Sequence, residues 1–309
     1  MDLLKELHGG LNQGYLTLCT TPPNTTNRMR TRWFDLADPT SISKLIEEGI
    51  RADGAGLEAY FSVCPGYRED RKNINRIKQE FATGLPAAFM DVDTDPSGFK
   101  HGDEKEGTVP KNKEEALAVF TALPLTPSVY VDSGHGLHPY WLLDHPLDLP
   151  TKEMREVANK YLKDFAGAIA AYTKYTGWDG CSELARILRI PGTHNHKEDP
   201  PLPVKIIEGS GKRYAIEEIL AFTKEHLPLP KPPFKPPATT FSPVDWQDRL
   251  KKAKKRADFN ELFNLRPVDD KSRDNSNDDQ RLMVRLAFWM DRDPGAMQAA
   301  FMASARAER

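Results

Sequence analysis

The stretch Ala87-Ala88-Phe89-Met90-Asp91-Val92-Asp93-Thr94-Asp95 decides how this chain is interpreted. Its apolar first half predicts a buried strand over residues 86–92 that ends at carboxylates. Because successive side chains of a strand point to opposite faces, Asp91 and Asp93 share one face. Two such carboxylates repel each other unless a cation lies between them. Hard oxygen ligands suit Mg²⁺ or Mn²⁺, which complete their shells with water and substrate phosphates, so the stretch predicts phosphoryl or nucleotidyl transfer.

Composition limits the classes of protein that the chain can belong to. Its 309 residues, 39% hydrophobic and 28% charged, are typical of a globular protein with one large or two smaller domains. We find no apolar run of membrane-spanning length and no signal peptide, and we expect a cytoplasmic protein without a membrane partner. The cysteines Cys19, Cys64 and Cys181 form no CxxC pair, so neither disulfides nor a zinc site is expected. With a net charge of −2, nucleic-acid binding would need a local basic patch, such as residues 68–78.

The order of periodic segments predicts two domains. Strand and helix patterns alternate up to a proline-rich stretch over residues 228–243, and only helical patterns follow it. We therefore predict an α/β (α+β) domain over residues 1–226, a linker over 227–244 and a helical domain over 245–309. The last helical pattern stops at Arg309 before it is complete, so we expect the helical domain to be truncated.

A second motif, Ser133-Gly134-His135-Gly136-Leu137-His138, lies between two predicted strands over residues 127–131 and 137–143. The glycines indicate a hairpin connection with positive φ angles. Exposed backbone N–H groups, together with a serine and histidines, suit the oxygens of a phosphate. The alternative is an ordinary hairpin whose histidines are satisfied within the fold.

A third motif runs from Trp178 to Lys197 and includes Asp179, Glu183, a Pro-Gly turn and several basic residues. Arg186 and Arg189 would share one face if the segment were helical. Two arginines and a lysine around a turn can bind a triphosphate or a nucleic-acid backbone, although a surface basic cluster is the alternative. The pair His194 and His196 is similar to the paired histidines of a nuclease metal site, but the residue between them is polar, which disfavours that interpretation.

Taken in this order, the three motifs resemble the archaeo-eukaryotic primase superfamily, in particular phage- and plasmid-type primase-polymerases. The resemblance runs from about Leu57 to Lys197, and Asp179-to-Lys197 is its most specific part. Residues 278–301 resemble the helical domain that follows such cores, often ahead of a helicase. The resemblance implies a primase catalytic core with an RRM-like sheet, followed by a small all-helical domain.

The resemblance also implies roles for particular residues. The implied catalytic residues and ligands of two Mg²⁺ or Mn²⁺ ions are Asp91, Asp93 and Asp179, with Glu183 as an alternative third acid. The implied nucleotide-binding residues are Ser133, His135, His138, Arg186 and Arg189. We prefer His138 to His135 as the phosphate ligand because it begins a strand. Asn195 and Lys197 match positions along the template and phosphate path.

The function implied is template-directed nucleotidyl transfer from dNTPs or NTPs, for primer synthesis and DNA extension in phage or plasmid replication. The expected partners are a single-stranded DNA template, a primer, the nucleotides and a replicative helicase, fused or recruited C-terminally, in the cytoplasm of a bacterial host. One alternative is a metal-dependent, relaxase-like nuclease that uses His194 and His196. A second is a non-catalytic DNA-binding adaptor in which the acids only shape a turn.

Overall fold

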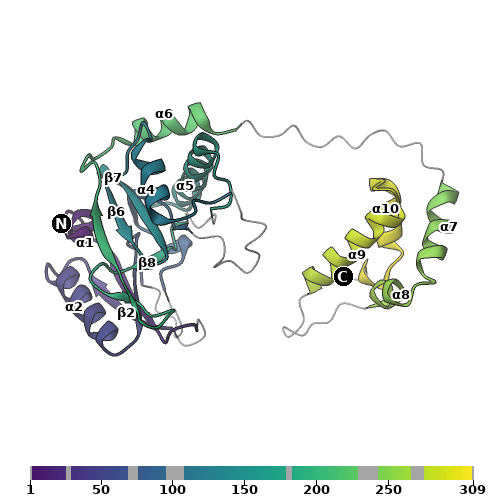
Figure 1. The fold of residues 1–309 in the computed structure, drawn as a ribbon, viewed down its shortest axis with the longest axis horizontal. Coiled ribbons are helices and arrows are strands. Elements are labelled where there is room, and N and C mark those ends of the chain that lie inside the picture. The colour runs from purple at the N-terminus through teal and green to yellow at the C-terminus, as the bar shows by residue number, and fades with distance from the viewer. Residues whose placement is uncertain are drawn as a thin grey trace. The chain divides into compact units, whose positions relative to one another are not determined.

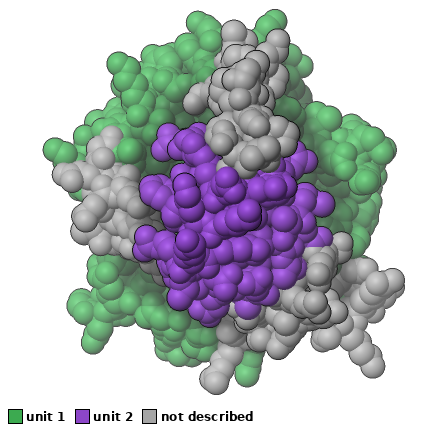
Figure 2. All heavy atoms as spheres, turned by 90° about the vertical axis from the view of Figure 1, so that its right-hand side faces the viewer, with its two compact units in different colours: residues 1–229 green, residues 230–309 purple. Residues whose placement is uncertain are grey.

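The structure is a computed structural model that describes residues 2–25, 29–68, 76–94, 108–178, 183–228, 243–265 and 275–307. The chain divides into two compact units, residues 1–229 and 230–309, which are drawn in different colours in Figure 2. We treat each unit by itself. None of the helices in the described ranges has the length and apolar character needed to cross a membrane.

A five-stranded antiparallel sheet forms the centre of unit 1 (Figure 1). Its order is β11-β6-β7-β4, and β5 also pairs with β7. The strands are β4 (Gly84–Phe89), β5 (Val92–Asp93), β6 (Val129–Asp132), β7 (Gly136–Asp148) and β11 (Lys205–Glu208). The long strand β7 therefore carries partners on both edges and determines the register of the sheet.

Helices cover one face of this sheet: α4 (Lys113–Thr121), α5 (Lys152–Thr173) and α6 (Ile216–His226). Trp141 of β7 packs edge-on against Phe120 of α4 and Phe165 of α5, and Phe165 in turn contacts Phe222 of α6. Because side chains alternate along a strand, Tyr140 and His138 of β7 point to the opposite face, away from these helices.

A four-stranded antiparallel sheet, in the order β2-β1-β3-β8, completes unit 1. Its strands are β1 (Tyr15–Thr21), β2 (Arg30–Asp35), β3 (Glu58–Ser62) and β8 (Ile187–Arg189). The helix α2 (Ser41–Gly54) lies close to it, since a side chain added at Gly49 would meet Leu18 and Ile190. Both sheets contribute to one hydrophobic core. Shorter elements are α1 (Leu3–His8), η1 (Gln79–Phe81) and the paired strands β9 (His194–Asn195) and β10 (Leu202–Pro203).

Unit 2 is helical within its described residues. It contains α7 (Pro243–Ala253), α8 (Ala257–Asn264), α9 (Asn275–Trp289), α10 (Pro294–Met302) and η3 (Ala305–Ala307). Phe259, Leu286 and Met290 are among the side chains of its own small core. Arg306 is buried and its Nε donates to Asp279 Oδ1 at 2.7 Å, which ties η3 to α9.

The prediction of an α/β (α+β) unit followed by a helical one is confirmed. The predicted strand over residues 86–92 is interrupted, because β4 ends at Phe89 and β5 begins at Val92. The helical arrangement considered for Arg186 and Arg189 is wrong, since residues 187–189 form strand β8. Most of the predicted linker, residues 229–242, lies outside the described residues.

Candidate active site

Asp91 lies directly across the sheet from His138. Phe89 pairs with Tyr140 and Val92 pairs with Leu137, so the register between these pairs places Asp91 opposite His138. Residues opposite each other on antiparallel strands share a face, and His138 Nε2 is 3.3 Å from Asp91 Oδ1. The histidine is buried, and its Nδ1 has no hydrogen-bond partner among the described residues.

Arg186 reaches the same carboxylate from the other sheet. Its backbone oxygen accepts a hydrogen bond from Val63 N, which fixes the chain just before β8 beside β3. Its guanidinium lies 3.8 Å from Asp91 Oδ2 and donates to Glu183 Oε2 at 3.2 Å. Arg186 therefore lies between two carboxylates, and the candidate site lies where the two sheets of unit 1 meet.

The surroundings of Asp91 keep its carboxyl group ionised. Burial raises the pKa of Asp91, but His138, Arg186 and Lys197 together lower it below its ordinary value. The nearby phenol of Tyr140 behaves oppositely, because burial and the charge on Asp91 raise the pKa of Tyr140. The site thus combines an ionised carboxylate, a neutral phenol, an imidazole and the basic side chains of Arg186 and Lys197.

Asp91 and Asp93 fit a divalent cation. Both are half-buried while Val92 between them is buried, which is the alternation expected for one shared face. A pair of carboxylates is the donor type that Mg²⁺ takes together with water and substrate phosphates. Asp179, the expected third ligand, and Asp95 lie outside the described residues. The described ranges contain no group of three or more histidine, cysteine or acidic side chains arranged to hold a metal.

The hairpin between β6 and β7 is held from two sides. Lys113 Nζ, at the start of α4, donates to both oxygens of Asp132 at 2.9 and 2.8 Å and to Gly134 O at 3.1 Å. Gly134 has a φ of +96°, and a Cβ there would come within 3.0 Å of Asn195 Cβ, so only glycine fits this turn. Asn195 Nδ2 donates to the backbone oxygen of Ser133 at 2.8 Å.

The two histidines of the hairpin have different neighbours. His138 contacts Asp91, whereas His135 Nε2 lies 3.8 Å from Glu198 Oε1. The backbone oxygen of His135 accepts a hydrogen bond from Thr94 Oγ1 at 2.8 Å. The structure therefore brings His138 to the carboxylates and holds His135 at the edge of the site.

Asp53 of α2 binds both histidines that flank Asn195. Its Oδ2 lies 2.9 Å from His194 Nδ1, and its Oδ1 lies 2.8 Å from His196 Nε2. The backbone N–H of His194 also donates to Asp53 Oδ1 at 2.7 Å. The pair considered for a nuclease metal site thus anchors β9 to α2, which positions Asn195 against the hairpin. Sequence reasoning missed Asp53 because no motif surrounds it.

Replacing Asp53 with alanine is expected to lower the free energy of unfolding by ~2 kcal/mol, because its histidine partners lose their acceptor. Burial raises the pKa of Asp53, but His194 and His196 lower it below its ordinary value. The advantage of the wild type over Asp53→Asn should therefore be complete above about pH 4 and shrink as the pH falls further. Urea unfolding at several pH values measures this difference.

The matched control is Glu47→Gln, which neutralises an exposed acid on the same helix. It should leave the unfolding curve close to that of the wild type. An Asp53→Asn variant as stable as the wild type at pH 7, or a difference that grows on acidification, would contradict the anchoring role.

Arg189 is placed differently from Arg186. It pairs across the sheet with Tyr60, its Nη1 donates to the carboxylate of Glu58, and its Cζ lies 4.9 Å from the centre of the Tyr60 ring. Both members of the ion pair are buried. Burial raises the pKa of Tyr60, Arg189 lowers it, and the charges on Glu58 and Asp91 raise it further. Because Asp91 acts on Tyr60, this cluster borders the carboxylates.

No family model matches the chain, and no curated protein matches it. Two solved structures are similar to it. The crystal structure of the catalytic domain of primase RepB' in complex with initiator DNA has 14% sequence identity and a TM-score of 0.42, covering 72% of this chain and 90% of that chain. The crystal structure of primase RepB' has 12% identity and a TM-score of 0.41, covering 99% and 96%. Both are primases, the class of protein that the sequence motifs resemble.

Proposed function

We propose that unit 1 is a primase-polymerase that joins nucleotides on a DNA template. The observation that carries this proposal is the contact set of Asp91: an ionised carboxylate two residues from a second one, with His138 and Arg186 beside it. The acids can bind the metal ion of a metal–triphosphate complex, and the basic groups can bind its phosphates.

Asp91 and Asp93 would hold Mg²⁺ or Mn²⁺, with Asp179 or Glu183 as the third acid. When bound, two such ions would lower the pKa of the attacking 3′-hydroxyl and stabilise the charge on the leaving pyrophosphate. Glu183 is a candidate because Arg186 contacts both it and Asp91, which places the two carboxylates on either side of one guanidinium.

The protein's own groups would bind and orient the triphosphate. His138 and Arg186 lie against Asp91, so they are positioned to contact phosphate oxygens of a nucleotide whose metal is held by that residue. The glycine hairpin adds Ser133 and His135 beside them. Lys113 and Asn195 fix this hairpin, which holds its side chains in place. The backbone N–H groups of Ser133 and Gly134 donate within the hairpin, to Gly136 O and Asp132 Oδ1.

The template would be single-stranded DNA, held through its phosphate backbone by charges that include Lys197. Lys197 acts on the pKa of Asp91 and follows the anchored strand β9, so it borders the carboxylates. The proposal includes a primer, dNTPs or NTPs and a replicative helicase as partners, and phage or plasmid replication in a bacterial cytoplasm as the setting.

The test is a synthesis assay on the full chain with a single-stranded template, with and without primer, with labelled dNTPs or NTPs, and with Mg²⁺, Mn²⁺ or a chelator. Template-dependent products that require a divalent ion are expected. Nicking of DNA without any nucleoside triphosphate would favour the relaxase-like alternative instead. Tight DNA binding without incorporation under every condition would favour the adaptor and overturn the proposal.

A further inference from the structure

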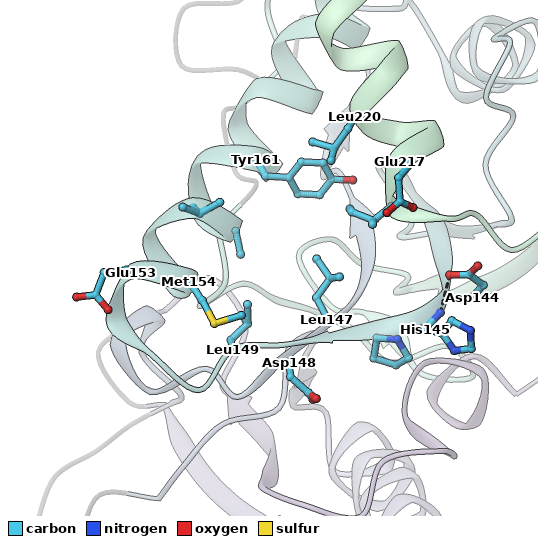
Figure 3. A pocket seen from close by; sticks show the side chains of 14 residues that line it. Asp144, His145, Leu147, Asp148, Leu149, Glu153, Met154, Tyr161, Glu217 and Leu220 are labelled. Carbon is cyan, nitrogen blue, oxygen red and sulfur yellow. Dashed lines mark hydrogen bonds between the residues drawn. The ribbon is translucent and has the colours of Figure 1, made fainter.

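An apolar groove lies on the helical side of unit 1, at the end of β7 remote from the candidate active site. It has a volume of about 640 Å³ and lies between the end of β7, the start of α5 and the start of α6 (Figure 3). Asp144 lies six positions after His138 on β7, which is about 20 Å along a strand. The groove is therefore separate from the site around Asp91.

Large apolar side chains line this groove and remain exposed to solvent. Val157 is 69% exposed, Leu220 46% and Met154 44%, and all three belong to the same groove. Tyr161 extends from α5 toward α6, as Figure 3 shows. The Tyr161 hydroxyl is buried without a hydrogen-bond partner among the described residues, and burial raises its pKa, so it stays a neutral donor. Exposed apolar side chains gathered in a hollow mark a binding surface.

Four carboxylates surround these apolar side chains in Figure 3: Asp144, Asp148, Glu153 and Glu217. None of them forms an ion pair with another side chain in the described ranges. Lysines of the neighbouring segments are engaged with other acids, Lys152 with Glu156 at 3.6 Å and Lys212 with Glu218 at 2.6 Å. Lys152 and Arg155 are among the groups that lower the pKa of Glu153, so its charge is partly compensated. Asp144, Asp148 and Glu217 leave a net negative rim, since none of them has an ion-pair partner in the described ranges.

We propose that this acid-rimmed groove docks an amphipathic helix of a partner protein. The helix would present apolar anchors to Leu147, Val157 and Leu220 and would carry lysine or arginine along its flanks. Helices bind grooves of this kind through apolar side chains at i, i+3, i+4 and i+7, and a volume of about 640 Å³ accepts several of them.

Charge complementarity selects this occupant. The four rim carboxylates attract basic flanks and repel phosphate-rich surfaces such as DNA or an anionic membrane. This surface is independent of nucleotidyl transfer, so its test does not depend on the proposed function.

The experiment measures fluorescence anisotropy of a labelled helical peptide, with leucines at i, i+3, i+4 and i+7 and lysines on its flanks, against the full chain. A matched peptide has glutamates in place of the lysines. We expect the lysine peptide to bind at least about tenfold more tightly than the glutamate peptide. Val157→Lys should weaken binding of the lysine peptide by at least about tenfold, because it puts a positive charge among the apolar side chains that line the groove.

The matched control is Ile50→Lys, which places the same charge at an apolar side chain that is 48% exposed on α2. It should bind like the wild type, and circular dichroism checks that both variants fold. The double variant Glu153→Lys/Glu217→Lys should reverse the preference in favour of the glutamate peptide. Equal binding of the two peptides, loss of binding in Ile50→Lys, an unreversed preference or no peptide binding at all would each overturn the proposal.

Discussion

Asp91→Asn should reduce template-directed synthesis by at least about 100-fold in kcat, because it removes one of the three acids that we propose as metal ligands. Asparagine has nearly the same shape and still offers an oxygen to His138. The side chain is 30% exposed at a strand end, so the substitution should leave the fold intact. Asp93→Asn should behave in the same way. Primer extension in Mg²⁺ and in Mn²⁺, alongside urea unfolding, separates lost catalysis from lost stability.

The control is Asp164→Asn, a neutralised acid on α5 that pairs with Lys160 away from the site. It should extend primers like the wild type. Near-wild-type primer extension by the Asp91→Asn/Asp93→Asn double variant would show that neither residue takes part in catalysis. A parallel comparison of Asp179→Asn with Glu183→Gln identifies the third acid, since loss of that ligand should resemble loss of Asp91.

The parts of the site that the sequence predicts are those set by short-range patterns. Alternation along the β4–β5 stretch places Asp91 and Asp93 on one face, and the glycine-rich turn predicts the hairpin that leads to His138. Once these two elements pair in register, the contact between Asp91 and His138 follows. The alternation of strand and helix patterns before the proline-rich stretch likewise predicts the mixed character of unit 1.

Contacts between distant segments could not be predicted in this way. Asp53 lies 141 residues before His194, and Glu58 lies 131 residues before Arg189. No local pattern links such pairs, because they meet only after the second sheet has formed. The strand β8 is also too short, at 3 residues, for its period to distinguish it from a helix. The sequence alone is therefore compatible with one shared face for Arg186 and Arg189, whereas the structure gives these arginines different partners.

This difference leads to a second large expected effect. Arg189→Met should lower the free energy of unfolding by about 3–5 kcal/mol, because it leaves the carboxylate of Glu58 buried without its cationic partner. The Glu58 and Arg189 side chains are 2% and 6% exposed, so water cannot replace the lost contact. Arg186→Met should cost far less stability, since the Arg186 side chain is 18% exposed and its carboxylate partners reach solvent.

The double variant Glu58→Met/Arg189→Met should recover most of the stability lost in Arg189→Met. It removes both buried charges and replaces them with apolar side chains of similar length, which is often nearly neutral for a buried ion pair. Urea unfolding of the wild type, the single variants Glu58→Met and Arg189→Met, and the double variant measures the recovery. A double variant no more stable than Arg189→Met would contradict the ion-pair role. The same folded double variant distinguishes the role of Arg189 in catalysis from that of Arg186. If Arg189 serves the fold, the KM for nucleotide stays near the wild-type value in the double variant and rises in Arg186→Met. A rise in KM of about tenfold or more in the stable double variant would instead show that Arg189 contacts the nucleotide.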